Sequence, residues 1–175
     1  MHALWKLTMT HSGSFSVARS PEEVFGLLSN PKWFAPAMPD FESMAIQDAT
    51  HFTMRIVIAM GEIKANANLA MELLQTSQAN RVEYRGTTTI AGGPLRLAVS
   101  FQLDAQDNTT VVNWQGDVTL GGMLAMMAGT LLDTMGRQTF DRMAERLQLR
   151  LQPAPPAAIE DSVAMAPLSE PDFDI

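Results

Sequence analysis

The sequence predicts an α+β fold in which seven antiparallel strands are followed by one long C-terminal helix, with two short helices after the first strand. Apolar and polar residues alternate through the middle of the chain, which is the period of a half-buried strand. Turn-forming residues interrupt this alternation at short intervals. From residue 122 onward the apolar residues follow the helical period instead. Together these observations predict a consecutive antiparallel sheet and a terminal helix.

The first part of the chain should form one strand and two short helices. Ser20 provides an N-cap, Pro21 suits the first helical position, and Glu23 completes a capping box. An Asn-Pro pair at residues 30–31 ends the helix that starts there. The predicted segments are a strand over residues 8–17, a helix over residues 21–28, a helical turn over residues 32–34 and a loop over residues 35–39.

Six strands should follow, because the period changes to two after this loop. In the clearest of them every second residue is apolar, so that each strand has one apolar face. The segments with this alternation are residues 52–60, 63–73, 95–103 and 112–118, and residues 81–90 form a further strand, which places five of the six strands. Turn-forming residues mark hairpin connections at residues 61, 77–80, 92–94 and 107–108.

Residues 122–151 should form a single long helix whose two halves differ. Residues 123–132 are apolar on every side, whereas the later half has an apolar stripe of Phe140, Met143 and Leu147 between charged residues. A helix that is apolar all round has to be covered all round. The first half should therefore be enclosed by the sheet, by loops, by a ligand or by a second protein.

Charge and composition divide the chain into a domain at residues 1–152 and a tail at residues 153–175. The chain has 175 residues, of which 46% are hydrophobic, so one ordinary core can form. Of the net charge of −7, the domain carries −2 and the tail carries −5. The tail is rich in proline and small residues, which predicts disorder, and its Leu168, Phe173 and Ile175 also suit a short docking motif. A nearly neutral domain argues against a nucleic-acid partner.

The usual signs of catalysis and of metal binding are missing from the sequence. Without cysteine there are no disulfides, thiolate metal sites or iron–sulfur clusters. The common hydrolase, zinc-protease and nucleotide-binding motifs are absent, and His2, His11 and His51 have no convincing spacing for a triad or a metal site. We therefore expect no catalytic residue, no metal and no covalent cofactor. Because no run of eighteen apolar residues and no signal-type N-terminus is found, we expect a cytoplasmic protein.

Four segments of the chain match a known family in their order and spacing. They read Ser-Pro-Glu-Glu-Val-Phe at 20–25 with Leu-Ser-Asn-Pro at 28–31, Met-Gly-Glu-Ile-Lys at 60–64, Thr-Val-Val-Asn-Trp-Gln-Gly-Asp-Val at 110–118, and Gly-Gly-Met-Leu-Ala at 121–125. In these the chain resembles the CoxG family of carbon monoxide dehydrogenase subunits, within the START-like (SRPBCC), polyketide-cyclase and plant-allergen superfamily. Two departures lead us to expect a different cavity mouth: Met38-Pro39-Asp40 stands where relatives have a proline–glycine turn, and the glycine-rich pattern around residues 87–93 is only partly present.

The resemblance implies both a fold and a function. The implied fold is a helix-grip, START/Bet v 1-like domain, in which a curved sheet wraps around the long helix and leaves an apolar cavity. The implied function is a non-catalytic accessory role beside a molybdenum-containing carbon monoxide dehydrogenase or related hydroxylase. It includes peripheral attachment at the inner face of the cell membrane and delivery of a bound isoprenoid quinone or lipid. The tail or a face of the long helix would dock the partner enzyme.

The candidate ligand-binding residues are apolar and lie on segments expected to face the interior. Thirteen methionines suit a cavity for a flexible ligand, although an ordinary methionine-rich core explains the composition equally well. Aromatic residues around the prolines of residues 31–41 should form a lid over the open end, or contact a membrane or partner if exposed. The predicted ligand-binding residues are Trp33, Phe34, Met38, Met54, Ile56, Ile58, Leu69, Met71, Leu97, Val99, Phe101, Trp114, Met123, Met126, Met127, Leu131 and Met135.

Two alternative functions remain open from the sequence. One is an enzyme of the cyclase or hydratase kind, which needs at least two polar groups inside the cavity, from among Arg55, Asn66, Glu83, Tyr84 and Gln102. The other is a pure assembly or membrane-recruitment factor. A basic row on the long helix could meet an acidic lipid or partner, but a solvated face paired with Asp141 and Glu145 is the commoner explanation; this row is Arg142, Arg146 and Arg150.

Overall fold

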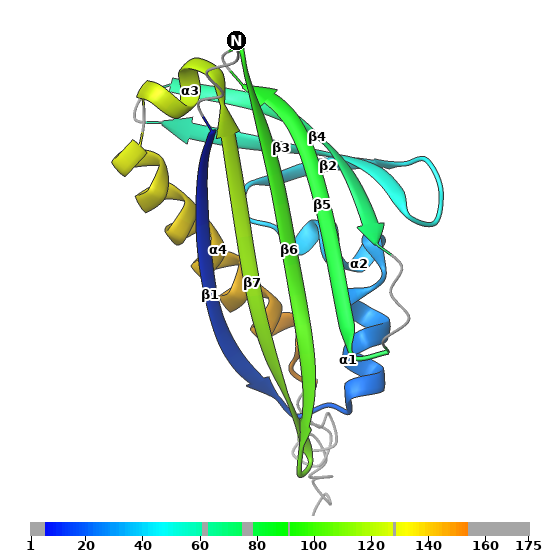
Figure 1. Cartoon of the computed structure of the whole chain (residues 1–175). Helices are drawn as coiled ribbons and strands as arrows, with labels where there is room; N and C mark the ends of the chain where they lie inside the picture. The colour runs from blue at the N-terminus through cyan, green and yellow to red at the C-terminus, as the bar shows by residue number, and fades with distance from the viewer. Residues whose placement is uncertain (1–5, 61–62, 75–78, 91, 128, 154–175) are drawn as a thin grey trace, which may run out of the picture.

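The computed structural model describes residues 6–60, 63–74, 79–90, 92–127 and 129–153 of the chain (Figure 1). The expected tail from residue 154 onward, the Gly61 turn and residues 77–78 lie outside the described residues. The elements in chain order are β1 (Lys6–Val17), α1 (Pro21–Leu28), α2 (Pro31–Phe34), the 3₁₀ helix η1 (Ala35–Ala37), β2 (Phe41–Ile46), β3 (His51–Met60), β4 (Ile63–Leu74), β5 (Arg81–Ile90), β6 (Gly93–Gln106), β7 (Thr109–Gly121), α3 (Gly122–Met127) and α4 (Gly129–Leu151).

The strands form one antiparallel sheet, which confirms the predicted α+β architecture. The strand order is β1-β7-β6-β5-β4-β3-β2, so β2 to β7 make a consecutive meander and β1 pairs with the last strand. Figure 1 shows the sheet curving, with β2 to β4 crossing behind the upper ends of β5 to β7 and α4 running behind β1 and β7. The sheet and α4 therefore enclose one interior.

Local sequence signals account for most of the element boundaries. The Ser20 side chain accepts a hydrogen bond from the Glu23 backbone N–H at 3.3 Å and starts α1, as the capping pattern predicts. Asn30 caps α2 in the same way, through the Lys32 N–H at 3.1 Å. At the β6–β7 hairpin Asp107 adopts a positive φ of 55°. One expectation is wrong: Pro94 lies in β6, paired with Thr89, where a proline is tolerated because it is close to the strand's first residue.

The predicted single terminal helix is divided into α3 and α4, on either side of residue 128. Gly122 leaves β7 with a φ of 63°, and α3 then lies across the upper end of the sheet, against β1, β6 and β7 (Figure 1). At this end the strands cover one side of the helix, so Met126 is 63% exposed. Met126 is therefore not covered by the sheet or by the described loops of this chain.

The buried core reaches the end of the domain where the short helices lie. There Leu147 and Leu151 of α4 pack with buried residues of α1, α2 and the ends of β1 and β7 where Phe15 pairs with Val112. Tyr84 fixes the short helices to the sheet, because its hydroxyl donates to the Leu28 carbonyl at 2.6 Å and its ring stacks on Phe34 at 4.0 Å. Burial raises the pKa of the Tyr84 phenol far above its ordinary value, so the hydroxyl stays a donor.

Candidate functional site

An apolar cavity of about 310 Å³ lies between the sheet and α4, bordered by residues of the buried core. Its volume is at the lower end of the range for small-molecule sites. Its lining residues on β6 and β7 lie toward the end of that ladder where Leu95 pairs with Leu120. The lining consists of Met9, Phe34, Met38, Pro39, Asp40, Met54, Ile56, Val57, Ala67, Leu69, Met71, Thr88, Ile90, Leu95, Leu97, Val99, Val118, Leu120, Met135, Gly136, Thr139, Phe140, Arg142 and Met143.

Strand alternation and small residues create this cavity. Ala67, Leu69 and Met71 are alternate residues of β4, so all three point to the same interior face. Two glycines on the sheet admit large side chains that form the walls. A Cβ atom at Gly86 would overlap the Met71 sulfur, and one at Gly116 would overlap the Phe140 ring. Met71 and Phe140 can therefore occupy these positions because residues 86 and 116 have no side chain.

One ion pair forms the polar rim of the cavity. The Arg142 Nη2 atom on α4 lies 3.3 Å from the Asp40 Oδ2 atom, which precedes β2. Asp40 has a φ of 61°, the left-handed conformation that a glycine would occupy in the proline–glycine turn expected of relatives. Its carbonyl accepts a hydrogen bond from the Val57 N–H of β3 at 3.0 Å. The pair therefore connects α4 to the start of β2, beside Val57 of β3.

The basic row of α4 contacts residues 33–40, which corrects the expectation of a solvated face paired with Asp141 and Glu145. Arg146 donates to the Met38 carbonyl at 3.1 Å. Arg150 donates to the Trp33 carbonyl at 2.7 Å, and its guanidinium lies 4.5 Å from the centre of the Trp33 ring. With the Asp40–Arg142 pair, the three arginines hold this segment against α4.

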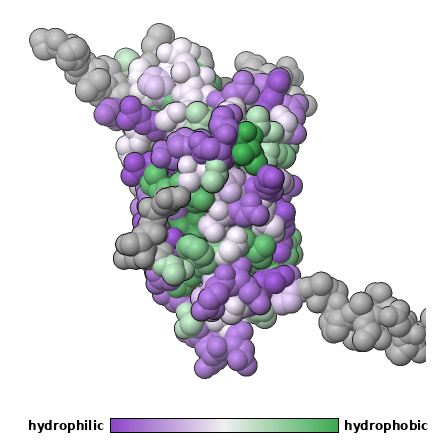
Figure 2. Space-filling view, turned by 90° about the vertical axis from the view of Figure 1, so that its right-hand side faces the viewer, coloured by the Kyte–Doolittle hydropathy of each residue, from purple (hydrophilic) through white to green (hydrophobic). Residues whose placement is uncertain are grey.

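The aromatic segment is a wall of the domain. Phe34, Ala35 and Ala37 are fully buried, and Phe34 stacks on Tyr84. This segment therefore does not form an exposed loop for membrane or partner contact. Figure 2, which views the molecule from the right of Figure 1, shows hydrophobic side chains at mid-height, between hydrophilic ones.

The structure brings nine of the predicted ligand-binding residues together around the cavity. They are Phe34, Met38, Met54, Ile56, Leu69, Met71, Leu97, Val99 and Met135. Phe101 and Trp114 are buried in the core beside the cavity, where Phe101 meets Phe34 edge to face and Trp114 stacks on Phe140. Trp33 lies under Arg150, and Met126 is exposed. The side chains of Ile58, Met123, Met127 and Leu131 lie outside the described residues.

Sequence reasoning missed part of the lining. Strand alternation could have identified Met9 of β1 and Leu120 of β7, because Met9 shares a face with Phe15 and Leu120 shares a face with Val118. Asp40 and Arg142 carried no such signal, since their pairing joins residues more than one hundred positions apart.

The polar residues expected to point inward in the enzyme alternative do not line the cavity. Arg55 pairs with Glu42 at 2.8 Å on the surface, and Asn66 is exposed. Glu83 lies 3.6 Å from Arg81 and 3.9 Å from Arg85, while Gln102 lines a shallow polar depression on the outer face of the sheet. Tyr84 is engaged with Leu28. The condition of two convergent polar groups among these five residues is therefore not met.

The two described histidines, His11 and His51, are not among the residues that line the cavity. His11 is buried between β1 and α4, with its Nε2 atom 3.5 Å from Asp133 and its ring 5.9 Å from that of Phe140. Among the residues described, no group of three or more histidine or acidic side chains is arranged to hold a metal ion. Within the same residues, none of the helices combines the length and apolarity needed to cross a membrane.

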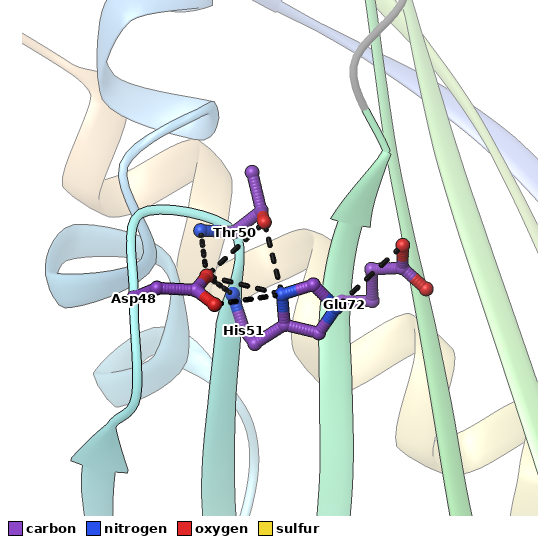
Figure 3. Close-up of polar contacts among 4 residues, drawn as sticks. All are labelled: Asp48, Thr50, His51 and Glu72. Atoms are coloured by element: carbon purple, nitrogen blue, oxygen red, sulfur yellow. Dashed lines mark hydrogen bonds and ion pairs between the residues drawn. The ribbon is translucent and has the colours of Figure 1, made fainter.

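His51 belongs to a polar cluster at the β2–β3 turn (Figure 3). The Asp48 carboxylate accepts hydrogen bonds from the backbone N–H groups of Thr50 at 2.8 Å and of His51 at 2.7 Å. The His51 ring lies between Asp48, 3.0 Å from Nδ1, and Glu72, 3.8 Å from Nε2. The Thr50 backbone bond, followed by the bonds from His51, lowers the pKa of Asp48 to about 2. The cluster fixes an exposed turn.

Similar folds occur in solved structures of low sequence identity, and these likenesses concern the fold alone. A conserved protein from Geobacillus kaustophilus has a TM-score of 0.69 at 14% identity, over 82% of this chain and 95% of that one. A START superfamily protein from Mycobacterium smegmatis has a TM-score of 0.59 at 12% identity, over 81% and 96%. Norcoclaurine synthase from Thalictrum flavum has a TM-score of 0.57 at 12% identity, over 83% and 87%. The predicted START/Bet v 1-like fold is confirmed.

Comparison at the sequence level identifies the family. A search of the curated proteins gives no match. The model of the family described as the CoxG subunit of carbon monoxide dehydrogenase matches residues 13–152, which include the last part of β1, all of β2 to β7 and α4. Because this match covers most of the chain, the chain belongs to the CoxG family of carbon monoxide dehydrogenase subunits.

Proposed function

We propose that this protein is a non-catalytic carrier of a lipophilic ligand, an isoprenoid quinone or a lipid. In this proposal it serves as an accessory protein of a molybdenum-containing carbon monoxide dehydrogenase or a related redox enzyme. The observation that carries the proposal is the cavity of about 310 Å³, whose lining is apolar apart from two threonines and one ion pair. Membership of the CoxG family supports the choice of partner.

The chemistry of the lining favours binding through apolar burial. Each 100 Å² of apolar ligand surface removed from water contributes about 2.5 kcal/mol before the costs of association. Methionines at positions 9, 38, 54, 71, 135 and 143 supply flexible wall atoms that adapt to the shape of a ligand.

A carrier role fits the lining better than a catalytic one. In the described part of the chain, the ionisable residues of the lining are Asp40 and Arg142, and they pair with each other at the rim. General acid–base catalysis requires a titratable group directed at the reacting atoms. Because Asp40 and Arg142 pair with each other at the rim, they are suited to position a ligand.

Native mass spectrometry of the full chain tests the carrier proposal. Protein stripped by solvent extraction and then incubated with decylubiquinone or a phospholipid should take up one molecule per chain. Protein that takes up neither and retains no lipophile from its host would overturn the proposal.

The partner proposal has a separate test. A molybdenum hydroxylase encoded beside this chain should co-purify with the loaded protein and reduce the quinone that it carries. If the hydroxylase binds the stripped and the loaded protein equally and reduces no carried quinone, the chain is an assembly factor.

A further inference from the structure

We propose that the Asp40–Arg142 pair selects uncharged lipophiles that carry an oxygen acceptor, such as a ring carbonyl, and rejects anionic amphiphiles. This inference rests on the proposed carrier function and names the chemical class of its ligand. Arg142 donates a hydrogen bond to the oxygen of the ligand's head, while Asp40 keeps the rim free of net charge.

The rim is built so that both charges face the same opening. Arg142 lines the cavity together with Thr139 and Met143 of the same helix, and Asp40 lines it from the other side with Pro39 and Val57. The Asp40 backbone is held on β3 by the Val57 N–H at 3.0 Å. A ligand whose body fills the apolar interior therefore presents its head to both side chains.

Arg142 has hydrogen-bonding capacity left for a ligand. A guanidinium has five N–H donors. Among the described residues Arg142 makes one hydrogen bond, from Nη2 to the Asp40 carboxylate. The two side chains are 52% and 45% exposed, and ion pairs of this exposure are weak. The guanidinium can therefore bind a ligand oxygen without leaving Asp40 or by partial exchange with it.

The pairing also decides which head group fits. A carboxylate or phosphate head at Arg142 would lie beside the Asp40 carboxylate, and this repulsion opposes its binding. A carbonyl oxygen accepts from Arg142 without adding charge. The other polar side chains of the described lining are the hydroxyls of Thr88 and Thr139, which bring no charge of their own.

The test uses the full chain and displacement of the apolar fluorophore diphenylhexatriene. The competitors are decylubiquinone, which is neutral and has carbonyls, oleate, which is anionic, and hexadecane, which has no oxygen. The wild type should prefer decylubiquinone to oleate. Arg142→Met should weaken decylubiquinone binding by about tenfold, as expected for loss of a hydrogen bond to a charged donor, and leave hexadecane unchanged.

Asp40→Asn is the second variant, because asparagine adopts the left-handed backbone readily and can still accept from Arg142. It makes the rim cationic, so the preference between oleate and decylubiquinone should shift at least fivefold toward oleate. Asp107→Asn is its matched control, since Asp107 has a similar φ of 55° at the distant β6–β7 turn. Arg137→Met, an exposed change on α4 outside the lining, is the control for Arg142.

The outcomes distinguish a failure of the rim proposal from a failure of the carrier proposal. If lipophiles bind but Asp40→Asn leaves the preference unchanged, the rim proposal is wrong and the carrier proposal stands. If the wild type prefers oleate and the Arg142→Met variant loses this preference, the rim is an anion site and the proposed selection of neutral ligands is wrong. If neither the fluorophore nor any competitor binds the wild type, both proposals fail together.

Discussion

Gly116 of β7 leaves room for the Phe140 ring of α4, and replacing it with alanine tests this contact. A Cβ atom at position 116 would lie well inside the van der Waals distance of three Phe140 ring carbons. Phe140 cannot rotate away freely. The Trp114 ring stacks on it with 6.0 Å between the ring centres, and the centre of the His11 ring, on the neighbouring strand β1, lies 5.9 Å away. Gly116→Ala therefore has to push α4 away from the sheet or strain the ring.

Overpacking of this kind costs about 1–3 kcal/mol. In a domain of this size, where about 2–4 °C of melting temperature corresponds to 1 kcal/mol, the midpoint should fall by roughly 2–12 °C. Gly26→Ala is the control, because Gly26 is exposed inside α1 and a Cβ there meets no atom within 4 Å. That change should stabilise the protein by about 1 kcal/mol. Thermal unfolding followed by circular dichroism measures both, and a Gly116→Ala variant as stable as the wild type would refute the contact.

Two further predictions concern stability. Tyr84→Phe removes the hydrogen bond to the buried Leu28 carbonyl and should cost about 1–3 kcal/mol in urea unfolding; an unchanged midpoint would mean that water replaces the hydroxyl. Because the pKa of Asp48 is lowered from 3.8 to about 2, its ionised form stabilises the native state above pH 4, and this contribution is lost as the pH falls toward 2. Asp48→Asn should therefore lower the melting temperature more at pH 7 than at pH 2, and an equal difference at both values would contradict this.

The elements of the fold were predictable where the signal is local. The cap at Ser20, the alternation through β3 and β4 and the turn at Asp107 each depend on a few neighbouring residues. The same alternation identified six lining residues on β3, β4 and β6, because it fixes the face on which a strand side chain lies.

The rest depends on contacts between distant segments, which a single sequence does not encode in its period. The sequence showed the regular spacing of the three arginines on α4, but it did not show that their partners lie in residues 33–40. The hydrophobicity pattern did not predict that α3 lies at the end of the sheet, where Met126 is exposed. Nor could it separate Phe101 and Trp114, which fill the core, from neighbours such as Val99 that line the cavity.

Filling the cavity tests the carrier account most directly. Ala67 of β4 is buried and lines the cavity, whereas Ala70 on the same strand faces solvent, so Ala67→Phe and Ala70→Phe make a matched pair. Binding of decylubiquinone to the two variants is measured by native mass spectrometry, at a temperature where both are folded. We predict that Ala67→Phe takes up no ligand and that Ala70→Phe takes up one molecule per chain, as the wild type does. Equal uptake by both variants would contradict the account, because the ligand would then bind outside the cavity.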